Sequence, residues 1–395
     1  MGALDGVRVL DVSMVVQGPQ AGQLLADLGA DVIKVELPGS GDFARGLVIS
    51  ADDPRSAMFY ALNRGKRSIS LDLRTEAGKT VLRRLAQGAD VLLSNFKPGT
   101  LDGWGLGYYD LAALNPRLIY ATGSAFGPVG PDAEREGADI NGQAAGGLLS
   151  TTGEDGSFPS PVGAFIADHA ASQNLAAGVL AALYARERTG RGQRVDVSLL
   201  GGQIWSQATE ITQYLLSGQV PGRANRGHPA VGGVWRVFAT ADGHLAIAGA
   251  RAPLWAGFCR AIERPDLIDD PRFSQGSARE ARWPELYSLL EAIFRTHSTD
   301  EWCTRLRAEG QRYAPLHDYA EVAADPQVWA NGYLIDVEHP QWGRIAAIGS
   351  PIRFSETPSN PGSIAPEVGQ HTEEVLLEAG FSWQEIAELR EQGAW

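Results

Sequence analysis

The chain has 395 residues with 47 acidic and 34 basic side chains, so its formal net charge is −13, and 44% of its residues are hydrophobic. This length suggests two domains and is sufficient for a hydrophobic core without disulfides or metal. The acidic excess argues against general nucleic-acid binding, which depends on Lys and Arg to neutralise phosphates. Two cysteines, Cys259 and Cys303, are too few for a secreted disulfide framework, and no Cys/His spacing indicates a metal site.

The N-terminal sequence, MGALDGVRVLDVS, lacks the basic region and apolar core of a secretory signal peptide. The best candidate for a membrane span, residues 175–185, is too short and is preceded by Gln173 and Asn174. We therefore expect a cytoplasmic protein that has neither a membrane nor a nucleic acid as partner.

In the first 125 residues, strand-like apolar runs alternate with helical spacing. The predicted strands cover residues 7–12, 31–36, 68–73, 90–94 and 117–122, and the predicted helices cover residues 20–28 and 76–86. Such alternation is typical of βαβ units, whose parallel sheet is covered by helices on both faces. We predict an α/β fold with a doubly wound parallel sheet.

The middle of the chain is less regular. Residues 126–165 are rich in Gly, Pro, Asp and Ser, which predicts a loop with one short helix near residues 141–149. A long helix is predicted over 170–186, a strand over 195–200 and another helix over 202–216. We interpret the Gly- and Pro-rich segment 217–231 as the linker to a second domain.

Beyond this linker the pattern indicates a smaller α+β domain. Residues 234–240 and 244–249, joined by an Asp-Gly turn, predict a β-hairpin. Helices are expected over 253–262, 283–295 and 299–308, followed by strands over 335–338 and 345–354 and a helix over 372–379.

The basic residues are concentrated in one stretch of this acidic chain. All four lysines and eleven of the 34 cationic residues lie between positions 34 and 97. Solvated helix faces explain such a cluster, and so does a local site for a small polyanion. The composition leaves both interpretations open. The eleven residues are Lys34, Arg45, Arg55, Arg64, Lys66, Arg67, Arg74, Lys79, Arg83, Arg84 and Lys97.

The loop after the first predicted strand does not have the sequence of a dinucleotide site. A dehydrogenase would carry G-x-G-x-x-G here, whereas residues 13–19 read SMVVQGP. Glu36 lies where a ribose-binding acid would follow the second strand, but it stands without the glycines. We exclude an NAD-dependent dehydrogenase.

Asp168 follows an apolar run and precedes the long predicted helix. As the N-cap of that helix it would accept backbone N–H bonds and stabilise the helix by about 1 kcal/mol. Alternatively, the helix dipole and the N–H bonds would keep it ionised, and it would attack an activated acyl group. The adjacent His169 does not face it on a helix, so we expect no acid–base pair.

Eight motifs along the chain resemble those of family III CoA-transferases, the family of the formyl-CoA, carnitine and bile-acid CoA-transferases. The resemblance covers nearly the whole chain and rests on the order and spacing of the motifs. They are LDGVRVLD (4–11), GADVIKVE (29–36), NRGKRSISLDL (63–73), NFKPG (95–99), PVGAFIAD (161–168), TGRGQRVDVSLL (189–200), ADPQ (324–327) and GQHTEEVL (369–376).

The resemblance implies a reaction and the residues that perform it. The family's nucleophilic aspartate corresponds to Asp168, which would form an aspartyl anhydride with the donor acyl group and then an aspartyl-CoA thioester. A mobile glycine loop maps onto Gly232 and Gly233, and polar neighbours of the reacting group map onto Asp139 and Gln143. CoA is then a substrate, and no tightly bound cofactor is expected.

The resemblance also implies contacts to CoA. The phosphates need cations, for which Arg45, Lys66, Arg67 and Lys97 are the nearest candidates. Leu37 and Gly103 stand where CoA-binding members often carry Arg, so the phosphate grip must differ here. The implied contacts are Val15, Val16, Gln17, Arg45, Leu71, Asn95, Phe96 and Lys97.

Two other functions remain as alternatives. The motif GADIN at 137–141 is similar to GHDIN of the α-methylacyl-CoA racemases, but Ala138 replaces the His that serves as a base. A non-catalytic CoA-binding protein would have no use for Asp168. The resemblance further implies an interlocked homodimer with acyl-CoA and a small carboxylic acid as substrates. The larger, Rossmann-like domain would comprise 1–224 and 326–395, and the smaller domain 225–325.

Overall fold

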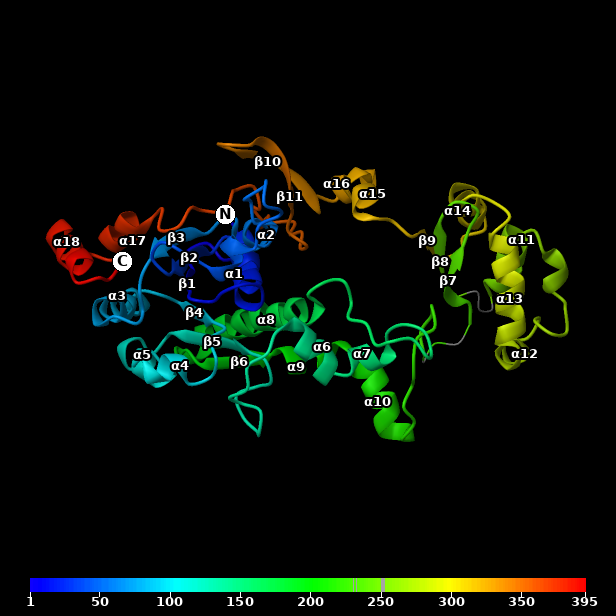
Figure 1. The fold of residues 1–395 in the computed structure, drawn as a ribbon, viewed down its shortest axis with the longest axis horizontal. Coiled ribbons are helices and arrows are strands. Elements are labelled where there is room, and N and C mark those ends of the chain that lie inside the picture. Colours follow the sequence, from blue (N-terminus) through cyan, green and yellow to red (C-terminus); the bar gives the residue numbers. More distant parts are fainter. Residues whose placement is uncertain (230, 232, 250–252) are drawn as a thin grey trace. The chain divides into compact units, whose positions relative to one another are not determined.

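The computed structural model of the protein describes residues 1–229, 231, 233–249 and 253–395. These residues form two compact units (Figure 1): the first contains 1–147, 162–207 and 326–395, and the second contains 148–161 and 208–325. The sequence placed residues 208–224 in the larger domain, but they group with the second unit. One reason is that the Ala224 N–H donates to the Thr151 carbonyl at 2.8 Å, which ties the two segments of that unit together.

A parallel six-stranded sheet forms the centre of the first unit, with the strand order β3-β2-β1-β4-β5-β6. The order reverses between β1 and β4, as in doubly wound nucleotide-binding sheets. The predicted α/β fold with a parallel sheet is therefore confirmed. The strands are β1 (Arg8–Asp11), β2 (Asp31–Glu36), β3 (Arg67–Ser70), β4 (Val91–Ser94), β5 (Ile119–Ser124) and β6 (Arg194–Ser198).

Helices cover both faces of this sheet, because successive strand residues point to opposite sides. Val9 belongs to a buried cluster with Leu25 of α1 and residues of α8. Its neighbour Leu10 belongs to a second cluster with Leu82 of α3 and with residues of α5 and α17. The helices are α1 (Gln17–Asp27), α8 (Ile166–Thr189), α3 (Glu76–Gln87), α4 (Thr100–Gly103), α5 (Tyr108–Leu114), α2 (Ala57–Asn63), α6 (Asp139–Ala145), α9 (Leu199–Ser206) and the 3-10 helix η1 (Phe43–Gly46).

Residues from the C-terminal part complete the first unit. Helices α17 (Thr372–Glu378) and α18 (Trp383–Glu391) pack in the cluster that contains Leu10. Ala394 is fully buried, and its carbonyl accepts a hydrogen bond from the Asp72 N–H at 2.7 Å. A short helix, α16 (Pro326–Ala330), precedes the hairpin of β10 (Leu334–His339) and β11 (Gly343–Ile348). The strand predicted over 345–354 thus ends at residue 348.

Several helix boundaries differ from the predictions for local reasons. Helix α1 begins at Gln17 rather than at residue 20, because Pro19 in its first turn needs no N–H partner. Helix α8 begins at Ile166 rather than at residue 170 and spans 24 residues. No helix in the described part of the chain is long and apolar enough to cross a membrane.

Ser198 ends the strand predicted over 195–200, because its hydroxyl accepts a hydrogen bond from the Gly201 N–H at 2.9 Å and caps helix α9. The helix predicted over 202–216 is two helices, α9 and α10 (Ala208–Ser217), separated at Gln207. The short helix near 141–149 is also two, α6 and α7 (Leu148–Thr151).

The second unit contains a three-stranded antiparallel sheet and a helical layer around one aromatic core. The predicted hairpin is present as β7 (Trp235–Ala239) and β8 (His244–Ala248), and β9 (Tyr313–Pro315) adds a strand that was not predicted. Phe258, Phe294 and Trp302 lie in the core. Besides α7 and α10, the helices of this unit are α11 (Trp255–Ala261), η2 (Pro265–Leu267), α12 (Gly276–Ala281), α13 (Trp283–Phe294), α14 (Thr299–Ala308) and α15 (Tyr319–Ala324).

Candidate active site

Asp168 lies in the first turn of α8, at the carboxyl edge of the parallel sheet. The crossover helix of a βαβ unit runs antiparallel to its strands, which places its N-terminus at that edge. Phe165 occupies the N-cap position and contributes no side-chain hydrogen bond. Asp168 is therefore not the N-cap that one interpretation of the sequence expected.

Asp139 supplies the missing cap from α6. Its Oδ1 accepts the N–H groups of Ala167 at 2.7 Å and of Asp168 at 3.1 Å. Its Oδ2 accepts a hydrogen bond from Gln143 Nε2 at 2.5 Å, and Gln143 Oε1 in turn accepts the Val162 N–H at 3.0 Å. Asp139 and Gln143 are both buried. The two sequence-predicted neighbours of Asp168 therefore fix the segment that begins its helix.

The carboxylate of Asp168 is only partly buried, and none of the described residues donates a hydrogen bond to it. Burial, followed by the nearby charge of Asp139, raises the pKa of Asp168 to about 7. In one of the two interpretations of the sequence, backbone N–H groups favour the ionised form of Asp168. That expectation is wrong, because Asp139 accepts the free N–H groups at the start of the helix.

His169 points away from this carboxylate pair toward α1. Its Nδ1 lies 2.6 Å from Gln20 Oε1, and burial lowers the pKa of the imidazole despite the charge of Asp139. The expectation that Asp168 and His169 do not form an acid–base pair agrees with this geometry. The His169–Gln20 contact instead joins the N-terminal turns of α8 and α1.

A cavity of about 200 Å³ opens at the carboxyl ends of β1 to β4, next to the point where the strand order reverses. Leu71 follows β3 and Phe96 follows β4, and both line it, as the resemblance implied for CoA contacts. Trp104 packs edge-on against Phe96 with the ring centroids 5.6 Å apart. The exposed Leu37 also lines the cavity. An aromatic and aliphatic lining of this kind suits a flat heterocycle.

The loop between β1 and α1 borders this cavity through Val12, Ser13 and Met14. The side chain of Asn95 holds Met14 on both sides, accepting its N–H at 2.8 Å and donating to its carbonyl at 2.7 Å. Val15 and Val16 follow, and Val16 is buried. Asn95 is thus a predicted site residue that shapes the loop.

Gln17 lies flat against β5. Its Nε2 donates to the Ser124 carbonyl at 3.3 Å, and only Gly123 leaves room for it, since a Cβ there would lie 2.3 Å from Gln17 Oε1. The predicted residues Gln17, Asn95 and Leu71 thereby lie along one edge of one sheet, the edge on which Asp168 also lies.

The residues 4–372 match the model of the family described as "CoA-transferase family III". The chain is 36% identical to the succinyl-CoA–D-citramalate CoA-transferase of Chloroflexus aurantiacus, covering 98% of this chain and 96% of the relative. It is 34% identical to a formyl-CoA:oxalate CoA-transferase of Bradyrhizobium, covering 99% and 97%. The protein belongs to CoA-transferase family III.

This family III CoA-transferase also resembles its relatives in three dimensions. A CAIB/BAIF family protein from Brucella suis superimposes with a TM-score of 0.85 at 36% sequence identity. The superposition covers 96% of this chain and all of the relative's. The mixed α/β architecture with its parallel sheet is therefore that of the family.

Three of the four cations expected to bind the CoA phosphates are in ion pairs within this family III protein. Arg45 forms two hydrogen bonds of 2.7 Å to Glu36, Lys66 is buried with Asp11, and Arg67 pairs with Asp31. Ten of the eleven cations between positions 34 and 97 are in ion pairs with acidic residues of the chain. Only Lys97, which is exposed, has no ion pair with a described residue.

The clustering of cations thus reflects internal ion pairs rather than a large polyanion site. None of the three candidates Arg45, Lys66 and Arg67 is a free cation, because Glu36, Asp11 and Asp31 pair with them. Their contact with CoA stays a prediction. Arg74 was not among the predicted site residues, yet it is exposed and lines the cavity, and among the described residues it pairs only with Asp72, two positions before it. Its position directly after the strand predicted over 68–73 was the signal that could have found it.

The predicted glycine loop lies in the second unit. Gly232 is outside the described residues. Gly233 has a φ of 101°, which few other residues adopt, and its carbonyl accepts a hydrogen bond from the Tyr287 hydroxyl at 3.1 Å. The conformation explains why glycine is needed at position 233.

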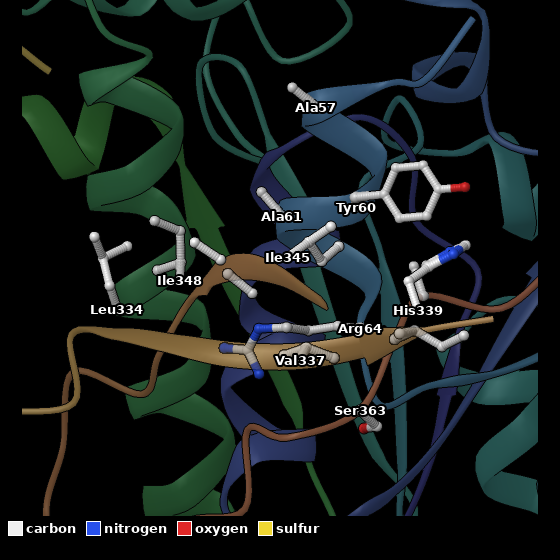
Figure 2. A pocket seen from close by; sticks show the side chains of 14 residues that line it. Ala57, Tyr60, Ala61, Arg64, Leu334, Val337, His339, Ile345, Ile348 and Ser363 are labelled. Carbon is white, nitrogen blue, oxygen red and sulfur yellow. The ribbon is translucent and has the colours of Figure 1, made fainter. Parts of the chain in front are cut away.

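Another cavity of the first unit contains none of the predicted site residues. It measures about 250 Å³ and lies between α2 and the β10–β11 hairpin (Figure 2). Apolar side chains such as Leu334 and Ile348 line it, together with the guanidinium of Arg64. Asp27 binds that guanidinium through both carboxylate oxygens, so the cavity offers no free charge.

The described residues include no group of three or more His, Cys, Asp or Glu that could hold a metal ion.

Proposed function

We propose that the protein transfers CoA from an acyl-CoA thioester to a carboxylic acid, with Asp168 as the nucleophile. The observation that carries this proposal is a partly buried carboxylate that accepts no hydrogen bond from any described residue. A carboxylate freed of solvating donors is more reactive toward an acyl carbon than one in water. Asp139 and Gln143 hold the helix turn that presents it.

The reaction would proceed in four displacements. An Asp168 oxygen attacks the thioester carbonyl, the C–S bond breaks and CoA leaves as a thiolate. The thiolate attacks the aspartyl carbonyl of the resulting anhydride, which releases the donor acid and forms an aspartyl-CoA thioester. The acceptor carboxylate attacks this thioester to form a second anhydride and CoA thiolate, which then attacks the acceptor acyl carbon and frees Asp168. No net proton is transferred, so no general acid is required.

The other predicted residues would bind and shield these intermediates. Leu71 and Phe96 would contact the adenine of CoA, while Val15, Val16 and Gln17 would lie along the chain that leads toward Asp168. Asn95 would act through the Met14 backbone. The resemblance assigns Gly233 to a mobile loop. The anhydride intermediates must be shielded from water, because an anhydride hydrolyses readily. CoA is a substrate in this scheme and not a resident cofactor.

Trapping of the acyl-enzyme tests the proposal. The protein is incubated with succinyl-CoA, the donor in the name of the Chloroflexus relative, and then with hydroxylamine. Mass spectrometry should find a hydroxamate on the peptide that contains Asp168. If a panel of acyl-CoAs leaves this peptide unmodified, the nucleophile is wrong. Exchange of the α-hydrogen of a 2-methylacyl-CoA for deuterium would support the racemase, and CoA binding without either reaction would support a non-catalytic protein.

The raised pKa of Asp168 predicts a pH dependence. Since only the ionised carboxylate attacks, kcat/KM for the acyl-CoA should rise about tenfold per pH unit below pH 7 and level off above it. The variant Asp139→Asn keeps an oxygen for the helix cap but removes the charge, so its profile should bend at a lower pH. Steady-state rates between pH 5 and 9 measure both profiles. An identical midpoint in the two proteins would contradict the assigned role of Asp139.

Lys97, which has no ion pair in the described part of the chain, predicts a moderate loss of CoA affinity on substitution. The change Lys97→Ala should raise the Kd for CoA by about five- to tenfold, the effect of one charge-assisted hydrogen bond to a phosphate. Lys79→Ala is the matched control, because Lys79 pairs with Glu76 on α3. Isothermal titration calorimetry gives both values. If the two variants bound CoA with equal affinity, Lys97 would not be a contact of CoA.

We also propose that the protein is a homodimer. Several large apolar side chains of α9 and α10 are exposed, among them Trp205 at 74% and Leu216 at 85%. Apolar surface of this kind is usually covered in an assembly. Light scattering coupled to gel filtration should give twice the 42.2 kDa mass of one chain.

A further inference from the structure

Val15 has a backbone conformation that its side chain disfavours. Its φ is 69°, in the left-handed region, where a β-branched residue is a rare outlier. It lies between the end of β1 and the start of α1, in the loop that borders the cavity at the carboxyl ends of the strands. Such strain persists only where the surrounding structure holds it in place.

A buried ion pair holds the loop at Val15 and at Ser13, on both sides of Met14. The carboxylate of Asp42 accepts the Val15 N–H at 3.1 Å, and Lys34 Nζ donates to the Ser13 carbonyl at 2.9 Å. Lys34 Nζ and Asp42 Oδ2 are 2.8 Å apart, and both side chains are fully buried. The pair therefore joins the two backbone groups that flank Met14, whose own N–H and carbonyl are bound by Asn95.

Further charges fix the orientation of this pair. Glu36 Oε2 accepts the Asp42 N–H at 2.9 Å, and Arg45 and the Ser68 hydroxyl hold the Glu36 carboxylate. A buried ion pair is on average no more stabilising than apolar side chains of the same volume. Stability alone does not account for a lysine and an aspartate here, whereas the directed hydrogen bonds to the loop do.

We infer that Lys34 and Asp42 are positioning residues, which hold Val15 in its left-handed conformation and so keep the loop 12–17 in the shape that receives CoA. This inference rests on the proposed function, because that loop is the proposed CoA contact. The pair acts through the backbone and does not touch the substrate. A loop that is fixed in advance loses less entropy on binding, so the effect appears in affinity for CoA.

A double-mutant cycle tests the inference, since glycine adopts a positive φ without strain. Four proteins are compared: the wild type, Val15→Gly, the pair variant K34M/D42A, and the pair variant combined with V15G. Titration calorimetry gives the Kd for CoA, and steady-state kinetics give KM and kcat for the acyl-CoA. The pair variant should weaken CoA binding about tenfold and raise KM more than it lowers kcat. In the V15G background the same change should cost less than about threefold.

The control is Glu263→Gly in the pair variant, because Glu263 has a φ of 57° in the second unit and should restore nothing. If K34M/D42A does not fold, the cycle is repeated with K34M/D42S, which also removes both charges of the pair and whose hydroxyl is too short to reach the Val15 N–H. Equal losses in both backgrounds, or no loss in either, overturn the inference while the wild type still binds CoA. A wild-type protein that binds no CoA overturns the proposed function and the inference together.

Discussion

Replacement of Asp168 by asparagine should lower kcat for CoA transfer by at least about 1,000-fold, the usual effect of removing a nucleophile. An amide nitrogen or oxygen does not form the anhydride, although it fills the same space, so binding of CoA should stay within about threefold of wild type. Initial rates with succinyl-CoA and a panel of carboxylic acids measure the loss. Asp300→Asn is the matched control, because Asp300 is an exposed aspartate in the first turn of another helix, α14.

The same substitution should stabilise the protein at alkaline pH. The pKa of Asp168 rises from an ordinary 3.8 to about 7 on folding, mainly through burial and then through Asp139. The folded state therefore binds the proton more tightly, and the wild type loses stability as the pH rises from about 4 to 7. Asp168→Asn lacks this loss and should be more stable by about 2 kcal/mol at pH 8, after allowance for partial exposure. Thermal unfolding at pH 4.5 and pH 8 separates the two cases.

Both results are needed to establish the nucleophile. A variant that loses activity but shows no gain in stability at pH 8 would indicate that Asp168 is not protonated near neutral pH. If Asp168→Asn kept its activity and Asp300→Asn lost it, the reacting group would lie in the second unit and not at Asp168.

Replacement of Asp11 by alanine should destabilise the protein by about 3–5 kcal/mol, because it leaves the buried Lys66 without its carboxylate. The Lys66 ammonium contacts Asp11 Oδ2 at 2.7 Å, the Pro19 carbonyl at 2.8 Å and Asn63 Oδ1 at 2.9 Å, and its side chain is fully buried. Burial already lowers the pKa of Lys66 to about 8 even with Asp11 present. Chemical denaturation at pH 7 measures the change in the free energy of unfolding.

Two variants serve as controls for this prediction. Asp53→Ala removes the partner of Arg55, whose side chain is 43% exposed, and should leave the free energy of unfolding almost unchanged, because solvent screens an exposed ion pair. The double variant D11L/K66M removes both buried charges and should recover most of the stability lost in Asp11→Ala. If Asp11→Ala were as stable as the wild type, water rather than Asp11 would compensate the buried charge of Lys66.

The parallel sheet could be predicted because its strands are short apolar runs separated by helical spacing. Each of β1 to β5 lies within three residues of a predicted strand, since strands buried on both faces leave a continuous apolar signal. The start of α8 could not be predicted in this way. Phe165, Ile166 and Ala167 read as the end of a strand, and the cap that begins the helix comes from Asp139, 29 residues before Asp168.

The candidate site was predictable where residues follow a strand and not where charges pair across the fold. Leu71 and Phe96 come one and two residues after the ends of strands of the same sheet, so their convergence on one cavity follows from the topology. The guanidinium of Arg45 donates hydrogen bonds to Glu36, which is nine residues away, and to the Pro366 carbonyl, which is 321 residues away. Nothing local in the sequence distinguishes such a paired arginine from a free one.

The burial of Ala394 against the segment after β3 has a consequence for synthesis of the protein. The face of the sheet that contains Leu10 lacks α17, α18 and Ala394 until the ribosome has added the last of them. Synthesis adds about 5–20 residues per second, so β1 to β4 exist for tens of seconds before the residues that cover this apolar face are made. During this interval the nascent chain exposes apolar residues that the finished protein buries. Loss of the final residues should lower the yield of folded protein more than its enzymatic rate.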